Sequence, residues 1–223
     1  MKMVKFLFLI TPILFFTAAC EEAPIFEGNG NLEFQFEINK QTGNLAKAAG
    51  DLSFQSGFIV IREIVFDGDR QGQSSVSITH EQISSIDFAT GVASPPVNVE
   101  IPAGEYRSVN LGIEIQDEND DPTIVLEGEY ERTDGTITPV RFEFGSGEVF
   151  EAEAERATVA SNIPAIAKIT FDPVSWFNRV SMNRMENAKL DANGVMVISE
   201  RKNEAIFDLV ADGLDRNTEA VFQ

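Results

Sequence analysis

Apolar and polar residues alternate with a period of two along much of the chain, and this alternation restricts the fold more than any other feature. Leu32, Phe34 and Phe36 are separated by acidic or amide side chains. Successive side chains of a β-strand point to opposite faces, so the pattern predicts strands with one buried face. Further runs with strand character lie at 58–66, 76–78, 97–101, 107–115, 123–131, 140–144, 148–155 and 165–171.

Gly, Pro, Asn and Asp stand at the joints between these runs, at intervals of about 8 to 15 residues. Asp67-Gly68-Asp69 and Pro102-Ala103-Gly104 predict turns, and Asp134-Gly135 predicts the turn of a hairpin. A parallel α/β fold would need long crossover helices between strands, and the sequence offers none there. We therefore expect a mainly β protein, with an antiparallel β-sandwich or a partly open barrel over residues 31–171.

The last fifty residues have a different pattern, and we expect residues 172–223 to form a helical C-terminal extension packed on the sandwich. Asp172 is suited to cap a helix that has Pro173 at its first position. Residues 204–214 have a helical apolar stripe, whereas 195–199 predicts a short strand. Trp176 is expected to pack this extension against the sheet, with an exposed binding platform as the alternative.

Residues 1–19 have the three-part layout of a secretory signal peptide. Lys2 and Lys5 give a basic start, residues 6–16 are apolar, and Thr17-Ala18-Ala19 supplies the small residues typical of a cleavage site. The stretch from Val4 to Ala19 is sixteen residues long, which is shorter than the roughly 20 that cross a bilayer as a helix.

The only cysteine, Cys20, directly follows the two alanines, and this segment resembles the lipobox of bacterial lipoproteins. The resemblance implies that the Cys20 thiol is lipidated and becomes the mature N-terminus. Two or more acyl chains give stable anchoring. Residues 20–30 would then be a lipidated tether, and Glu21-Glu22 resembles the signal that exports lipoproteins of Bacteroidota-type bacteria to the cell surface. An unlipidated signal peptide and an ordinary acidic linker are the alternatives.

A second and weaker resemblance involves residues 101–106, Ile-Pro-Ala-Gly-Glu-Tyr. This stretch is similar to the beginning of a hairpin in uncharacterised Bacteroidota lipoproteins with prealbumin-like β-sandwiches. The resemblance implies a sandwich fold and says nothing about function.

Charge and composition exclude several classes of function. The chain has 36 acidic against 17 basic residues, a net charge of -19, which opposes binding to nucleic acid and to anionic lipid head groups. One cysteine and one histidine exclude an internal disulfide, a Cys-rich zinc site and any site with two imidazoles. His80, the single imidazole, is expected in an exposed loop.

The best candidate metal site is the acidic segment 116–122. Asp117, Asn119 and Asp121 have the i, i+2, i+4 spacing with which a loop directs oxygen ligands onto Ca²⁺. The EF-hand pattern fails beyond this point, because Pro122 replaces the required Gly and Gly128 replaces the final Glu. A solvated acidic hairpin loop is the alternative. Asp67-Gly68-Asp69 is a weaker candidate, and paired carboxylates suited to glycoside hydrolysis give no specific signal in so acidic a chain.

These observations favour a non-enzymatic, lipid-anchored module of the outer membrane, displayed at the cell surface, that contacts a protein or glycan partner or serves as a structural component. The first alternative is a periplasm-facing accessory lipoprotein with a Ca²⁺-stabilised loop. The second is a glycoside hydrolase with a carboxylate pair. No cofactor is expected other than Ca²⁺.

Overall fold

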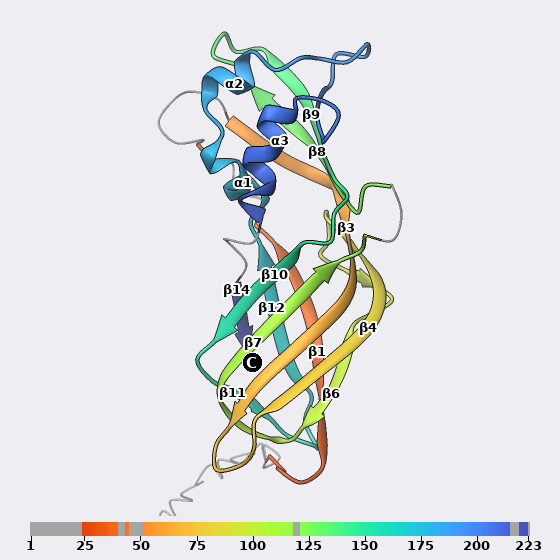
Figure 1. Cartoon of the computed structure of the whole chain (residues 1–223), viewed down its shortest axis with the longest axis vertical. Helices are drawn as coiled ribbons and strands as arrows, with labels where there is room; N and C mark the ends of the chain where they lie inside the picture. The colour runs from red at the N-terminus through yellow and green to blue at the C-terminus, as the bar shows by residue number, and fades with distance from the viewer. Residues whose placement is uncertain (1–23, 40–42, 45–50, 118–120, 215–218, 223) are drawn as a thin grey trace, which may run out of the picture.

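The computed structural model describes residues 24–39, 43–44, 51–117, 121–214 and 219–222. The molecule is elongated and has two parts (Figure 1). We call the lower part, made of strands only, the barrel, and the upper part, which holds the helices, the cap. The prediction of a mainly β fold with a short helical C-terminal segment is confirmed.

The strands form two sheets. The first sheet has the order β14-β12-β1-β6, and β1 is parallel to β12. Its strands are β1 (Asn29–Ile38), β6 (Asn98–Pro102), β12 (Ala165–Phe171) and β14 (Glu219–Phe222). The second sheet follows the path β10-β7-β3-β8-β9-β13, to which β2, β4, β5 and β11 are joined. Its strands are β2 (Gly43–Asn44), β3 (Asp51–Arg70), β4 (Val76–Asp87), β5 (Ala93–Ser94), β7 (Gly104–Ile115), β8 (Ile124–Glu131), β9 (Ile137–Phe144), β10 (Val149–Ala154), β11 (Ala157–Val159) and β13 (Met196–Ile198).

The strand β3 is 20 residues long and belongs to both parts of the molecule. Its first half pairs with β8 in the cap, and its second half lies between β4 and β7 in the barrel. The predicted turn at Asp67-Gly68-Asp69 is therefore wrong, because these residues continue the strand. Gly68 faces inward and contacts the ring of Tyr106, so a side chain there would collide with that ring. Gly68 therefore lies inside a strand and leaves space for the Tyr106 ring.

Pro102-Ala103-Gly104 does not form a hairpin, although the sequence suggested one. The strand before it, β6, pairs with β1, whereas the strand after it, β7, pairs with β3. The chain changes sheets at this corner, and Ala103 is the only residue between the two strands. The Tyr106 hydroxyl donates a hydrogen bond of 2.6 Å to the Pro102 carbonyl, and its ring packs edge-on against Phe66. Tyr106 therefore fixes the corner with a hydrogen bond to the first sheet and ring packing within the second.

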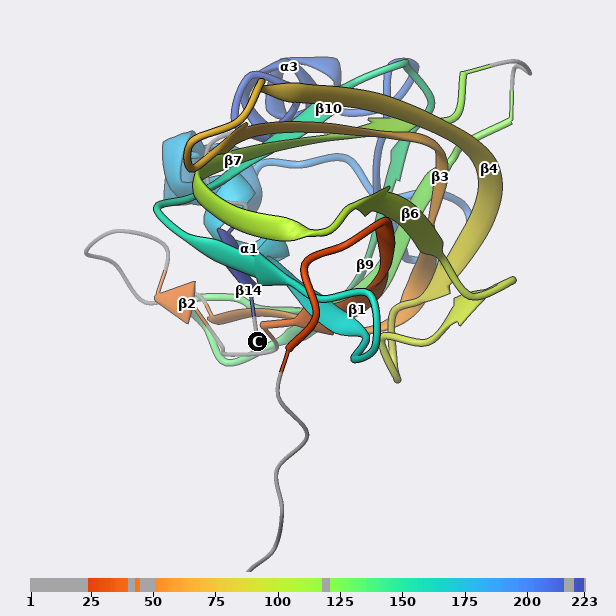
Figure 2. The same ribbon diagram turned by 90° about the horizontal axis from the view of Figure 1, so that it is seen from below.

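The barrel is partly open, as the alternative prediction anticipated. Viewed from below, its strands curve around a common interior (Figure 2). At one side β10 lies beside β14. At the other side, hydrogen bonds from Gln82 Nε2 to the Pro96 carbonyl (2.9 Å) and from Ser84 Oγ to the Pro95 carbonyl (2.5 Å) connect β4 to the segment before β6. Prolines lack an amide proton, so side chains supply this connection.

The C-terminal segment contributes a strand to each sheet as well as the helices. Its elements are α1 (Pro173–Trp176), η1 (Phe177–Arg179), α2 (Met182–Glu186), β13, α3 (Glu204–Ala211) and β14. The predicted cap is confirmed, since Asp172 accepts a hydrogen bond of 3.3 Å from the Ser175 amide. β13 runs parallel to β9, and β14 runs antiparallel to β12. This segment therefore connects the cap to the barrel.

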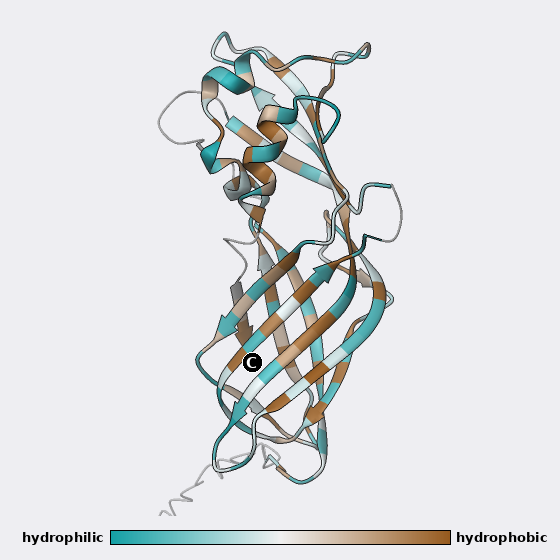
Figure 3. Cartoon of the chain, in the orientation of Figure 1, coloured by the Kyte–Doolittle hydropathy of each residue, from teal (hydrophilic) through white to brown (hydrophobic). Residues whose placement is uncertain are grey.

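An aromatic cluster fills the junction between the helices and β9. Phe142 has its ring centroid 5.8 Å from that of Phe177, 6.3 Å from Phe207 and 6.5 Å from Trp176. Trp176 is buried and also stacks on Phe150 of the barrel at 5.8 Å. The prediction that Trp176 packs the extension against the sheet is therefore confirmed. Apolar and polar residues alternate along the strands around this core (Figure 3).

Replacing Phe142 by Ala should destabilise the protein by about 3–5 kcal/mol, because it leaves a cavity among the three aromatic rings of Trp176, Phe177 and Phe207. The matched control is Ile137→Ala on the same strand, whose side chain is 51% exposed and which should cost less than about 1 kcal/mol. Urea unfolding followed by the fluorescence of Trp176, the single tryptophan, measures both. Equal losses of unfolding free energy in the two variants would show that Phe142 is not a core residue.

Candidate functional site

The cap contains an open polar pocket of about 700 Å³, which we call the cap pocket. Its walls come from α2 and the segment after it, from the turn that contains Arg201, and from the first turn of α3. Three cationic side chains line it, Arg184, Lys189 and Arg201, together with one carboxylate, Glu204. All four are exposed. The remaining lining residues include three asparagines and a serine.

Glu186, the last residue of α2, fixes this helix to the β8–β9 hairpin. Its Oε1 accepts hydrogen bonds of 3.0 Å from the Tyr130 hydroxyl and from the Thr133 amide. Its backbone carbonyl accepts a bond of 2.7 Å from Arg132, which also forms a 3.5 Å ion pair with the carboxylate. Asp134-Gly135 forms the hairpin turn as predicted. One wall of the cap pocket is therefore held by a partly buried polar network.

Asn203 fixes the opposite wall. Its backbone is left-handed, with φ of 53°, a conformation that asparagine tolerates better than most residues. Its side chain donates to the carbonyls of Lys189 (2.9 Å) and Val197 (2.7 Å) and accepts from the Lys189 amide (2.8 Å). Because these bonds occupy the side chain, Asn203 makes no capping hydrogen bond to α3. The first turn of α3, which lines the pocket, therefore has no side-chain cap, and the Asn203 carbonyl accepts from the Ile206 amide at 2.8 Å.

The cations of the pocket form no ion pair, unlike five of the nine other cations that the structure describes. Arg62, Arg132, Arg141, Lys168 and Arg179 each form an ion pair with a carboxylate. Within the described residues, Arg184, Lys189 and Arg201 form none within 4.0 Å, although Arg184 donates to the Ala205 carbonyl at 3.3 Å. No motif in the sequence indicated this site. Its only sequence signal is a nearly neutral segment, with five basic and six acidic residues between 173 and 214 in a chain of net charge -19.

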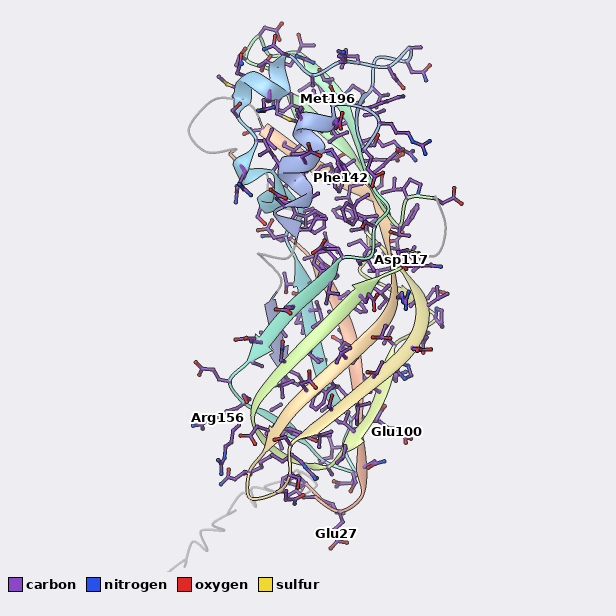
Figure 4. The ribbon with its side chains drawn as sticks, in the orientation of Figure 1. Glu27, Glu100, Asp117, Phe142, Arg156 and Met196 are labelled. Atoms are coloured by element: carbon purple, nitrogen blue, oxygen red, sulfur yellow. The ribbon has the colours of Figure 1, made fainter. Side chains whose placement is uncertain are left out.

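The predicted calcium site is described only in part. Asp117 lies between the barrel and the cap (Figure 4) and pairs with Arg62 at 3.0 Å. Asp121 is exposed, and Asn119 lies outside the described residues. Among the residues that are described, no three His, Cys, Asp or Glu side chains are grouped so as to hold a metal ion. Calcium binding at Asp117, Asn119 and Asp121 therefore stays a prediction.

The weaker candidate, Asp67 and Asp69, projects from the outer face of β3. Together with Glu153 and Glu155 these residues line a shallow pocket of about 550 Å³ across β3, β4, β7 and the end of β10. The strand pairing places Asp67 opposite Ser77 on one side and Asn110 on the other. The arrangement is an acidic, solvated sheet surface.

The prediction that His80 lies in an exposed loop is wrong. His80 is half-buried inside β4, opposite Ile64, and its Nε2 lies 3.3 Å from Gln82 Oε1. The sequence signal failed here because Gln82 and Ser84 bond to the Pro95-Pro96 carbonyls at the opening of the barrel. That stretch of strand therefore lacks the usual apolar alternation.

The opposite end of the molecule receives the N-terminal segment. The Ile25 amide donates to Asn162 Oδ1 at 2.8 Å, and the Ile25 carbonyl accepts from the Ser161 amide at 2.8 Å. Three large apolar side chains are exposed here, Ile25 (49%), Phe26 (40%) and Ile163 (40%). We call them the basal patch. Glu27, beside it in sequence, lies at the end of the barrel farthest from Met196 of the cap (Figure 4).

Cys20 and the predicted signal peptide lie outside the described residues. No helix within the described ranges is long and apolar enough to cross a membrane. The sequence matches no protein-family model, and neither a curated protein nor a solved structure is detectably similar to it.

Tyr130 should ionise far above the ordinary range. Burial and the hydrogen bond to Glu186 raise its pKa from 10.0 to about 12. Its contribution to folding stability is complete below pH 10 and is lost as the pH rises toward 12. Burial also raises the pKa of Tyr106, the only other tyrosine. Tyr106→Phe therefore isolates Tyr130 for titration by phenolate absorbance, and a midpoint near 10 would contradict the network.

Asn203→Ala should destabilise the protein by about 2–3 kcal/mol, because it removes three hydrogen bonds and because alanine tolerates the left-handed backbone less well than asparagine does. Asn203→Gly loses the same bonds but tolerates the backbone, so it should recover about 1 kcal/mol. Urea unfolding of both variants separates the two contributions. Equal stability of the alanine and glycine variants would show that the backbone conformation contributes nothing.

Proposed function

We propose that this protein is a lipid-anchored module of a bacterial outer membrane that acts by binding a partner, without catalytic activity. Acyl chains on Cys20 hold it on the membrane, and its cap faces away from the lipid. It is displayed at the cell surface, where the partner is a protein or a glycan.

The observation that carries this proposal is the place where the chain joins the barrel. Ile25 is hydrogen-bonded to the loop between β11 and β12, at the end opposite the cap. Five peptide units separate Cys20 from Ile25, so a fully extended chain spans at most about 18 Å. A lipid on Cys20 would therefore keep the basal end close to the bilayer.

The basal patch also supports the proposal. Ile25, Phe26 and Ile163 expose apolar surface at the end that a lipid on Cys20 would bring to the membrane. Apolar side chains gain free energy when they enter the boundary between head groups and acyl chains. The patch would therefore favour an upright molecule whose cap points into the surrounding medium.

The titratable groups with shifted pKa values have structural roles. Tyr106 bonds the corner at Pro102, and Tyr130 bonds Glu186. Hydrogen bonds from Thr136 lower the pKa of Asp134, and backbone hydrogen bonds, led by that from Val195, lower the pKa of Asp191. None of the described carboxyl groups is fully buried. These groups give no support to the glycoside-hydrolase alternative, which needs an acid with a raised pKa.

Cys20→Ser should abolish acylation and move the protein from the membrane fraction to the soluble fraction. Metabolic labelling with an alkyne fatty acid, followed by fractionation, measures both. Thr17→Leu is the matched control and should keep the label, since lipoboxes of bacterial lipoproteins prefer leucine at the position that Thr17 occupies here. Unchanged fractionation of the serine variant would overturn the anchor. Protease treatment of intact cells tests display, and protection would favour the periplasm-facing alternative.

A further inference from the structure

We propose that the cap pocket binds an oxyanion, a phosphate or sulfate group that is either free or carried by a sugar. This inference rests on the proposed binding function and names the class of ligand. Arg184, Lys189 and Arg201, together with the first turn of α3, form the site.

The charge distribution carries the first step. In the described part of the chain, five cations form ion pairs with carboxylates of the protein, whereas the three cations of the cap pocket, like Arg70, Arg107, Arg156 and Lys202, have no ion-pair partner there. Carboxylates outnumber cations about twofold in this sequence, 36 to 17, so partners are plentiful. What distinguishes the three cations of the cap pocket is that they line one pocket together with a single carboxylate, Glu204. This excess of cations leaves a local positive potential that an anion can neutralise.

The hydrogen-bond donors of the pocket also suit an oxyanion. Two of the cations are arginines, whose planar guanidinium groups form paired hydrogen bonds to phosphate, sulfate or carboxylate oxygens. Arg184 is fixed over the first turn of α3 by its bond to the Ala205 carbonyl. The side chain of Asn203 is occupied by Lys189 and Val197 and does not cap α3. The positive end of the helix therefore adds to the attraction of the three side chains.

The lining also favours an anionic ligand over a neutral sugar. The described residues around the pocket are mostly charged residues, asparagines and small residues, and none of them has an aromatic side chain. Neutral sugars bind largely by stacking on aromatic rings. Recognition in this pocket would instead depend on charge and hydrogen bonds, so the strength of binding should fall as salt concentration rises.

The test uses the mature chain, residues 20–223 with Cys20→Ser, so that its result does not depend on acylation. Isothermal titration measures binding of sodium sulfate, sodium phosphate, a sulfated disaccharide and its unsulfated parent, with ionic strength held constant by sodium chloride. The variants are Lys189→Gln with Arg201→Gln, and the matched control is Lys202→Gln. Lys202 lies in the same turn as Arg201 but does not line the pocket.

We expect saturable binding of the sulfated disaccharide or of the free ions, and none of the unsulfated parent. The double variant should weaken binding at least about tenfold, whereas Lys202→Gln should change it less than about twofold. If the free ions bind, the site recognises the anion alone. If the sulfated disaccharide binds and the free ions do not, the site recognises the sugar-borne group. Absence of saturable binding to all four probes, or equal weakening by Lys202→Gln, would overturn the proposal and leave the anchor untouched.

Discussion

The structure depends on the continuity of β3, because this strand is the central member of both the barrel and the cap. At about 3.3 Å per residue, its 20 residues extend over roughly 65 Å. Gly57 lies where the strand passes from one part to the other, and its φ of 135° is a conformation that L side chains rarely adopt. A side chain there would also collide with the Val125 carbonyl of β8. Close backbone packing at this one point lets a single strand serve two differently shaped halves.

Much of the fold follows from local patterns, and the departures have identifiable causes. Alternation in β1, β7 and β12 and the Asp172 cap indicated elements that the structure contains. The prediction failed where residues typical of turns instead make contacts with residues that are distant in sequence. Gly68 suggested a turn but makes room for the Tyr106 ring, and residues 102–104 suggested a hairpin but form a corner between sheets. These residues have the composition of turns. Only the residues that they contact, which are distant in sequence, show that they form a strand and a corner between sheets instead.

The candidate site could not be predicted for the same reason. Arg184 and Arg201 are 17 positions apart in sequence, and no spacing rule relates them. They share a pocket because Asn203 bonds to both Lys189 and Val197, which brings the segment after α2 against the end of β13. Glu186 meanwhile fixes α2 to the β8–β9 hairpin. The contacts of Asn203 and Glu186 with residues distant in sequence thus create the site. The sequence itself shows only a local change in charge balance.

That change in charge balance explains how a strongly acidic protein can offer a site to an anion. Between residues 20 and 172 there are 28 acidic and nine basic residues, but between 173 and 214 the numbers are six and five. At physiological ionic strength the Debye length is about 8 Å, far less than the length of β3. An anion at the cap pocket therefore responds to the nearby arginines and lysine and to the carboxylates of the cap, Glu204 first among them, and hardly to those of the distant barrel. The acidic barrel can keep the molecule soluble and oppose its adsorption to anionic lipid, while the cap retains its own chemistry.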